Sequence, residues 1–147
     1  MKSLRSLADR ERKGTSDEIA TCRNAGISTV MFTGDHINTA KAIARDLGIL
    51  TDDSQAMMGA DIDKYSDEEF EKLVENICVY ARVQPEHKTR IVNAWKANNA
   101  ITAMTGDGVN DAPSIKSADI GVGMGITGTD VTKNVADMVL ADDNFAT

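Results

Sequence analysis

Short apolar runs recur along the chain, and each is followed by a polar or glycine-containing turn. Runs of about four to eight branched or aromatic residues between such turns predict buried strands. The predicted strands cover residues 27–32, 77–81, 100–104, 119–122 and 138–141, with a shorter candidate at 56–58.

Between these runs, apolar residues are spaced at helical intervals. Ala40, Ile43, Ala44 and Leu47, for example, share one face of a helix. The predicted helices cover residues 19–25, 38–47, 67–76, 85–98, 111–117 and 130–136. Apolar strands that alternate with helices predict an α/β fold, namely a three-layer, Rossmann-like and mostly parallel sheet with helices on both faces.

The triplet Thr-Gly-Asp occurs twice, at 33–35 and at 105–107, each time at the end of a predicted strand. Ligands of open parallel sheets lie at the carboxyl ends of the strands. A hydroxyl group and unpaired backbone N–H groups at such a place can bind phosphate oxygens. For residues 33–35 alone, a simple turn in which Asp35 caps the next helix explains the pattern equally well.

Asp107 and Asp111 flank a glycine-rich turn and can face one point. Magnesium prefers carboxylate oxygens, and it takes one or two of them together with phosphate and water. Gly106 and Gly108 allow the backbone to approach closely. The pattern predicts a Mg²⁺ site, and the alternative is a polar loop in which Asp111 caps a helix.

Lys88 lies in the first turn of the helix that Pro85 begins, where the helix dipole disfavours a cation. A single lysine on a helix is usually a solvated surface charge, so Lys88 alone indicates little. His36 and His87 are more typical of surface or structural residues than of catalytic ones.

Together these segments resemble the haloacid dehalogenase-like phosphotransferases and, within them, the P-type ATPases. Two further segments resemble the calcium-pump branch. The resemblance covers residues 9–147, as part of a phosphorylation domain, and leaves residues 1–8 as an unmatched start. The segments that carry it are FTGDH at 32–36, VYARVQPEHK at 79–88, MTGDGVNDAP at 104–113, GMGITGTDV at 123–131 and LADDNF at 140–145.

The resemblance implies a role for each residue of the glycine-rich turn. Asp107 would be the direct Mg²⁺ ligand. Asp111 and Asn110 would hold the water shell of the metal and the phosphoryl oxygens. Lys88 would neutralise the transferred phosphoryl group, so Lys88, Asp107 and Asp111 are the expected catalytic residues. Phosphoryl transfer depends mostly on such positioning and charge neutralisation.

The resemblance also implies a nucleotide-proximal set and a parent protein. Thr33 and Gly34 would bind phosphoryl oxygens, while Asp35 and Arg82 would help to place ATP. The parent would be an integral membrane protein that hydrolyses ATP through an aspartyl phosphate. This chain would lie at the cytoplasmic face and work with nucleotide-binding, actuator and transmembrane domains. Calcium, as the transported ion, rests on the branch resemblance, and sodium, proton and manganese remain open as alternatives.

The chain departs from the family at the nucleophile. The family phosphorylates the aspartate of Asp-Lys-Thr-Gly-Thr, and that string is absent, so the chain alone is expected to be inactive. Asp61–Lys64 is rejected as a substitute because no apolar strand precedes it. Asp9–Arg12 lacks the two prolines of the family pattern. Because the nucleophile strand is central in the family, we expect an incomplete sheet, in which the strands ending at Thr33 and Thr105 close up or admit a foreign strand.

Three other functions remain open. A stand-alone soluble phosphatase of the same superfamily would need an internal nucleophile. A dinucleotide-binding module is indicated by GxGxxG at 123–128, but too little chain follows for the rest of that site. A non-catalytic binding domain is compatible with every motif above.

The composition of the chain limits the classes of molecule that it can be expected to bind. A net charge of −7 over 147 residues argues against nucleic acid and against docking on anionic lipid. No apolar run reaches the roughly 18 residues of a membrane span. Cys22 and Cys78 lie far apart without a CxxC motif, which indicates neither a zinc site nor a redox pair.

Overall fold

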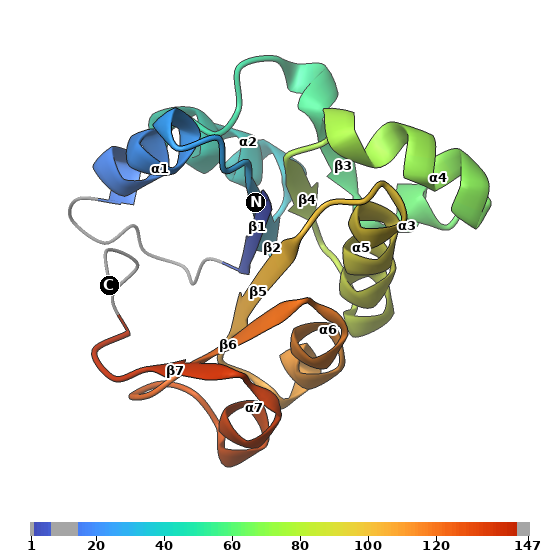
Figure 1. Ribbon diagram of the computed structural model, residues 1–147. Coiled ribbons are helices and arrows are strands. Elements are labelled where there is room, and N and C mark those ends of the chain that lie inside the picture. The colour runs from blue at the N-terminus through green and yellow to red at the C-terminus, as the bar shows by residue number, and fades with distance from the viewer. Residues whose placement is uncertain (1, 7–14, 144–147) are drawn as a thin grey trace.

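A computed structural model describes residues 2–6 and 15–143, with only the backbone for residues 2–6. One sheet of seven strands forms the middle layer, in the order β3-β4-β2-β1-β5-β6-β7, and every neighbouring pair is parallel (Figure 1). The strands are β1 Lys2–Ser6, β2 Thr29–Thr33, β3 Ala56–Met58, β4 Val79–Ala81, β5 Thr102–Gly106, β6 Ile120–Met124 and β7 Met138–Leu140.

Helices cover both faces of this sheet, which confirms the predicted α/β class. Helices α1 and α2 lie on one face, and α4, α5, α6 and α7 lie on the other (Figure 1). The helices are α1 Thr15–Asn24, α2 Ile37–Asp46, α3 Gly59–Ile62, α4 Asp67–Leu73, α5 Pro85–Ala97, α6 Ala112–Ser117 and α7 Asp130–Val135. Short 3-10 turns cover Asp53–Gln55, Val74–Asn76 and Val109–Asp111.

Strand β2 contributes side chains to two hydrophobic clusters, one on each face of the sheet. Its side chains alternate between the faces, because successive residues of a strand point in opposite directions. Val30 and Phe32 pack with the cluster beneath α4, α5 and α6, whereas Met31 packs with the cluster beneath α1 and α2. All three are almost fully buried, as expected of a central strand in a parallel sheet.

The expectation of a gap beside the strands ending at Thr33 and Thr105 is wrong. Strand β1 lies between β2 and β5 and pairs with both, with Leu4 opposite Val30 on one side and Met104 on the other. The physical reason is that two facing strand edges would otherwise leave rows of backbone N–H and C=O groups unpaired. Residues 2–6 fill this position with their backbone, although they do not form an apolar run.

Asp61–Lys64, rejected above as a nucleophile segment, forms no strand. Gly59–Ile62 is the short helix α3, and Asp61 pairs with Lys64 at 2.7 Å. Asp9–Arg12 lies outside the described residues. Cys22 and Cys78 are both half-buried and unbridged. Among the described residues, none of the helices combines the length and the apolar character of a membrane span.

Candidate functional site

The two Thr-Gly-Asp triplets flank the carboxyl end of β1. Thr33 ends β2 and Gly106 ends β5, and these are the two strands that pair with β1. The register sets Ser6 opposite Phe32 on one side and Arg5 opposite Thr105 on the other. Parallel strands end at the same edge, so the topology gathers both triplets where such folds bind ligands.

Lys88 reaches into this edge from the first turn of α5. Its Nζ atom donates to Oδ1 of Asp111 at 2.6 Å, and the two side chains are only 15% and 6% exposed. The alternative of a solvated surface lysine is therefore wrong. A partly buried pair like this is costly to break from one side, because the remaining charge loses its counter-charge.

The second oxygen of Asp111 holds the glycine-rich turn together. Oδ2 accepts from the backbone N–H groups of Asp107 at 3.3 Å and Gly108 at 3.2 Å. Gly106 makes this possible, since a Cβ at that position would lie 2.5 Å from the Cβ of Asp111. Asp111 thus stabilises the turn and also binds Lys88. It is the N-cap residue of α6, but its side chain forms no cap hydrogen bond there, so the alternative of a helix cap does not describe what this side chain does.

Asp107 presents its carboxylate differently. The residue is exposed, and its side chain forms no ion pair within the described part of the chain. Its carbonyl oxygen accepts from the N–H of Thr129 at 3.0 Å, which ties the turn to the loop after β6. Asn110 is likewise exposed.

The donor atoms at this edge suit magnesium better than a metal that is coordinated only by protein side chains. The available donors of Asp107, Asp111 and Asn110 are hard oxygens. No group of three or more His, Cys, Asp or Glu side chains gathers as a metal cage in the described residues. One or two carboxylates completed by phosphate and water is the coordination that magnesium takes at phosphate sites.

The hydroxyl groups at the edge are arranged for a further partner. Thr33 is buried, and its Oγ1 accepts from the N–H of Asp35 at 3.0 Å. Oγ1 of Thr105 is buried and has no hydrogen-bond partner within the described residues. A buried hydroxyl without a partner is costly, so a ligand or water oxygen at this edge would satisfy it.

Asp35, Gly34 and Arg82 follow the strands β2 and β4 at the same edge, and among the described residues no hydrogen bond or ion pair joins them to Lys88 or Asp111. His36, rather than Asp35, caps α2, because its Nδ1 accepts from the N–H of Asn38. Gly34 is exposed. Arg82 follows β4 with a φ of 49°, a left-handed conformation that non-glycine residues rarely adopt. Its side chain is exposed and forms no ion pair in the described residues.

Sequence reasoning missed how the start of α5 is held. His87 is buried, its Nδ1 accepts from the N–H of Gln84 at 3.0 Å, and its Nε2 lies 3.1 Å from both carboxylate oxygens of Asp63. Gly59 lies against the ring, since a Cβ there would meet His87 Nδ1 at 2.7 Å. These contacts fix the helix turn that carries Lys88. Gln84 and His87 stand in capping-box spacing, but nothing local indicates Asp63, 24 residues away.

Comparisons with known proteins match the chain to one hydrolase family and to cation-transporting ATPases. Over residues 3–119 the sequence matches the haloacid dehalogenase-like hydrolases. It is 55% identical over its whole length to a calcium-transporting ATPase of Bacillus subtilis. It is 54% identical over 97% of its length to a calcium-transporting ATPase of Listeria monocytogenes, and 46% identical over 97% to a probable cation-transporting P-type ATPase of Mycoplasma genitalium.

A solved structure of an ATPase domain is also similar to this chain. The catalytic domain of the CPx-ATPase CopB-B, studied for its conformational changes upon nucleotide binding, matches 95% of this chain with a TM-score of 0.69 and 28% identity. The match covers 44% of that chain. The present chain spans only 16% of the length of the Bacillus and Listeria relatives and 15% of the Mycoplasma relative.

Proposed function

Because the chain belongs to the haloacid dehalogenase-like hydrolase family, we propose that it is part of the phosphorylation domain of a calcium-transporting P-type ATPase. In this proposal the chain supplies the half of the site that binds Mg²⁺ and the transferred phosphoryl group. The parent hydrolyses ATP through an aspartyl phosphate and moves the cation across a membrane. The assignment to calcium rests on the 55% identity to the Bacillus ATPase.

The contact between Lys88 and Asp111 carries the proposal. It links helix α5 to the turn after β5 at the edge where ligands of this fold bind. The ammonium group of Lys88 neutralises charge on the incoming phosphoryl oxygens, while Asp111 keeps the ammonium in place beforehand. A preorganised charge of this kind stabilises the transition state without having to reorganise during the reaction.

Asp107 supplies the exposed carboxylate for the metal, and Asp111 and Asn110 complete the oxygen set through water and phosphoryl oxygens. Bound Mg²⁺ would neutralise negative charge on the phosphate. Because Oδ1 of Asp111 is bonded to Lys88 and Oδ2 to two N–H groups, Asp107 is the more accessible direct ligand.

Thr33 and Gly34 bind phosphoryl oxygens on the other side of β1, and Asp35 and Arg82 help to place ATP. The left-handed backbone of Arg82 supports this role, because strained residues cluster at ligand sites. The parent would supply the nucleophile, together with the nucleotide-binding, actuator and transmembrane domains that work with this chain. The chain would lie at the cytoplasmic face of the membrane.

The proposal is tested in the full-length parent. Asp107→Ala should abolish Mg²⁺-dependent formation of a hydroxylamine-sensitive phosphoenzyme from labelled ATP, because the direct metal ligand is lost. Asp46→Ala, an exposed carboxylate at the end of α2, serves as the matched control and should leave the phosphoenzyme unchanged. Normal phosphoenzyme in Asp107→Ala would rule out the assigned role.

The stand-alone phosphatase is distinguished with the chain itself. Incubated with Mg²⁺ and p-nitrophenyl phosphate, the 147-residue chain should show no turnover above the Asp107→Ala variant, because it lacks the nucleophile motif. Magnesium-dependent turnover that Asp107→Ala removes would favour the phosphatase. Binding of a phosphate analogue without turnover agrees with the proposal.

A further inference from the structure

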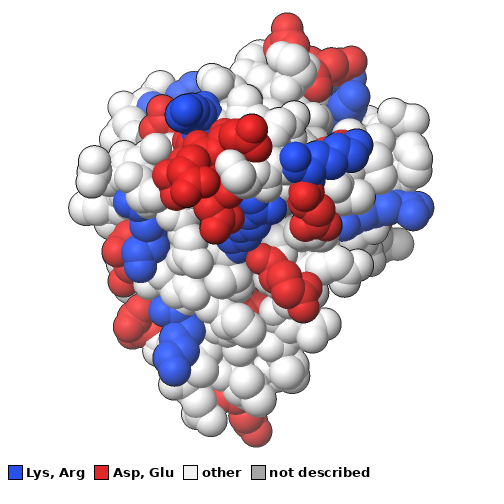
Figure 2. Space-filling model, turned by 90° about the vertical axis from the view of Figure 1, so that its right-hand side faces the viewer, with Lys and Arg blue, Asp and Glu red and all other residues white. Residues whose placement is uncertain are grey.

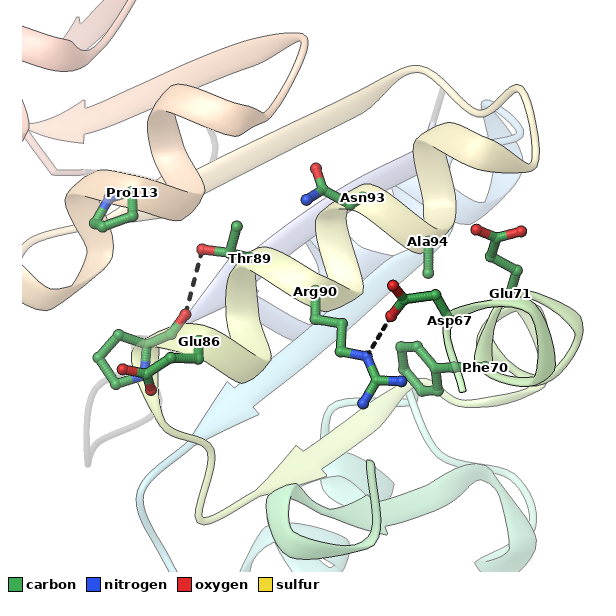
Figure 3. A pocket seen from close by; sticks show the side chains of 10 residues that line it. Asp67, Phe70, Glu71, Glu86, Thr89, Arg90, Asn93, Ala94 and Pro113 are labelled. Carbon is green, nitrogen blue, oxygen red and sulfur yellow. Dashed lines mark hydrogen bonds and ion pairs between the residues drawn. The ribbon is translucent and has the colours of Figure 1, made fainter. Parts of the chain in front are cut away.

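A groove lies on the outer surface of α5, on the opposite side of the helix layer from the sheet. It is bounded by α4 and by the start of α6, and it encloses about 460 Å³ (Figure 3). None of the expected site residues lines it. A volume of this size is in the range of ligand and side-chain binding cavities.

The floor of the groove is largely apolar. Pro85 at the start of α5 and Pro113 at the start of α6 line it, while Phe70 of α4 and Ala94 of α5 close it from beneath and are themselves only 0% and 5% exposed (Figure 3). From Pro85 to Ala94 the groove follows α5 for about 13 Å, at the helical rise of about 1.5 Å per residue. This length accommodates roughly two turns of another helix.

Arg90 lines the groove, but its guanidinium group already has hydrogen-bond partners within the chain. Its guanidinium donates to Asp67 at 2.9 Å, to the carbonyl of Ile62 at 2.8 Å and to the carbonyl of Tyr65, and it lies 5.5 Å from the centre of the Phe70 ring. All of its nitrogens therefore have partners in the chain. Arg90 holds α5 against α3 and α4, and its charge is balanced by Asp67.

Two other carboxylates remain unbalanced. Glu86 lies at the start of α5 and Glu71 on α4 near Ala94, so they stand towards the two ends of the groove (Figure 3). Neither forms an ion pair within the described part of the chain. The face in Figure 2 carries a cluster of acidic side chains with Lys and Arg side chains beside it, and α4 begins with three consecutive acidic residues.

We propose that this groove docks a basic amphipathic helix of a partner polypeptide. Apolar side chains of the partner would lie on the floor, and a lysine or arginine at each end would pair with Glu86 and Glu71. Laying the apolar face of a helix into a groove between helices is a recurrent mode of peptide recognition. Charge complementarity then selects a cationic partner and speeds association.

The acidic rim disfavours the other occupants. Nucleic acid and anionic lipid would be repelled by unpaired carboxylates. A second copy of the chain would bring a net charge of −7 to a groove whose two ends already carry Glu86 and Glu71.

The test uses the whole chain and two labelled peptides of about four helical turns. One carries leucines along a single face with arginines flanking them, and the other has glutamates in place of the arginines. Fluorescence anisotropy should show saturable binding of the arginine peptide that weakens with salt, and no binding of the glutamate peptide.

Two variants locate the binding. Glu71→Lys with Glu86→Lys should weaken the arginine peptide about tenfold or more, since two attractions become repulsions. Asn93→Trp should block the groove sterically, because Asn93 is exposed and lines it. Asp17→Lys with Asp46→Lys, two exposed carboxylates on the opposite face, is the control of equal charge and should bind like the unaltered chain.

Several outcomes would overturn the proposal. These are the absence of binding at low salt, equal losses in the control and the groove variant, and unchanged binding by Asn93→Trp. Circular dichroism on each variant checks that the fold is retained. Analytical ultracentrifugation of the unaltered chain provides the remaining test, and dimerisation that Asn93→Trp abolishes would assign the groove to a second copy.

Discussion

At the scale of single residues, Gly106 is the position that the site tolerates least. A Cβ there would lie 2.5 Å from Cβ and 2.8 Å from Cγ of Asp111, which is itself bonded to Lys88. Gly106→Ala should therefore lower the free energy of unfolding by about 2 kcal/mol, within the usual range for overpacking. Urea unfolding followed by circular dichroism measures this difference.

Gly34 offers the matched control within the same motif. A Cβ there would meet nothing within 4 Å, and its backbone is not left-handed. Gly34→Ala should change the free energy of unfolding by no more than about 0.5 kcal/mol. Equal losses in the two variants would show that Asp111 does not pack against Gly106.

The sequence predicts the place of the site better than its contacts. Thr33, Asp107 and Asp111 were expected at the carboxyl edge because strand ends and Thr-Gly-Asp triplets can be recognised locally, whereas Lys88 was expected there only from the family resemblance. That Asp111 would share its two oxygens between a lysine and a turn was not predictable. Such partners depend on the packing of α5 against the turn, which no local pattern encodes.

At the scale of elements, most strands and helices follow from apolar spacing, and the exceptions have simple causes. Helix α3 was missed because four residues are too short to show a helical period. Strand β1 was missed because its residues, Lys-Ser-Leu-Arg-Ser, lack the apolar run of a central strand. In both cases tertiary contacts, and not local preference, decide the conformation.

Asp119 joins the beginnings of two central strands and gives the fold a dependence on pH. Its carboxylate accepts from the N–H of Thr102 at 2.8 Å and from its hydroxyl at 3.1 Å, where β5 begins and just before β6. These hydrogen bonds, that of the backbone N–H first, hold the pKa of Asp119 below its ordinary value. An aspartate in the unfolded chain titrates near 3.9, so the ionised group stabilises the folded state above that pH.

The stabilisation should disappear as pH falls from about 4 through the lowered pKa of the folded state. Asp119→Asn should thus unfold at lower urea than the unaltered chain at pH 7, and the difference should shrink below pH 4. Asp46→Asn, an exposed residue at the end of α2, should not reproduce this pattern. A difference that stays constant from neutral to acid pH would contradict the assignment.

At the scale of the whole molecule, the sheet depends on strand β1, which pairs with both of its neighbours but does not contain the nucleophile motif of the family. β1 takes the central place, between the two strands whose ends carry the candidate site. A polar strand can hold this position because an interior strand satisfies the backbone groups of both neighbours. The same arrangement explains why the chain forms a continuous sheet while lacking Asp-Lys-Thr-Gly-Thr.

Hydrogen exchange can establish whether β1 belongs to the cooperative core. Its amides should be protected to the same degree as those of β2 and β5, because they exchange only when the sheet opens globally. Leu4→Pro removes one ladder N–H opposite Val30 and Met104 and should cost about 3 kcal/mol or more, whereas Leu4→Val keeps the backbone and should cost far less. If residues 2–6 exchanged freely while β2 stayed protected, and Leu4→Pro behaved like Leu4→Val, the central strand would not be part of the stable sheet. The two Thr-Gly-Asp turns would then have to be held in place by α5 and the glycine-rich turn alone.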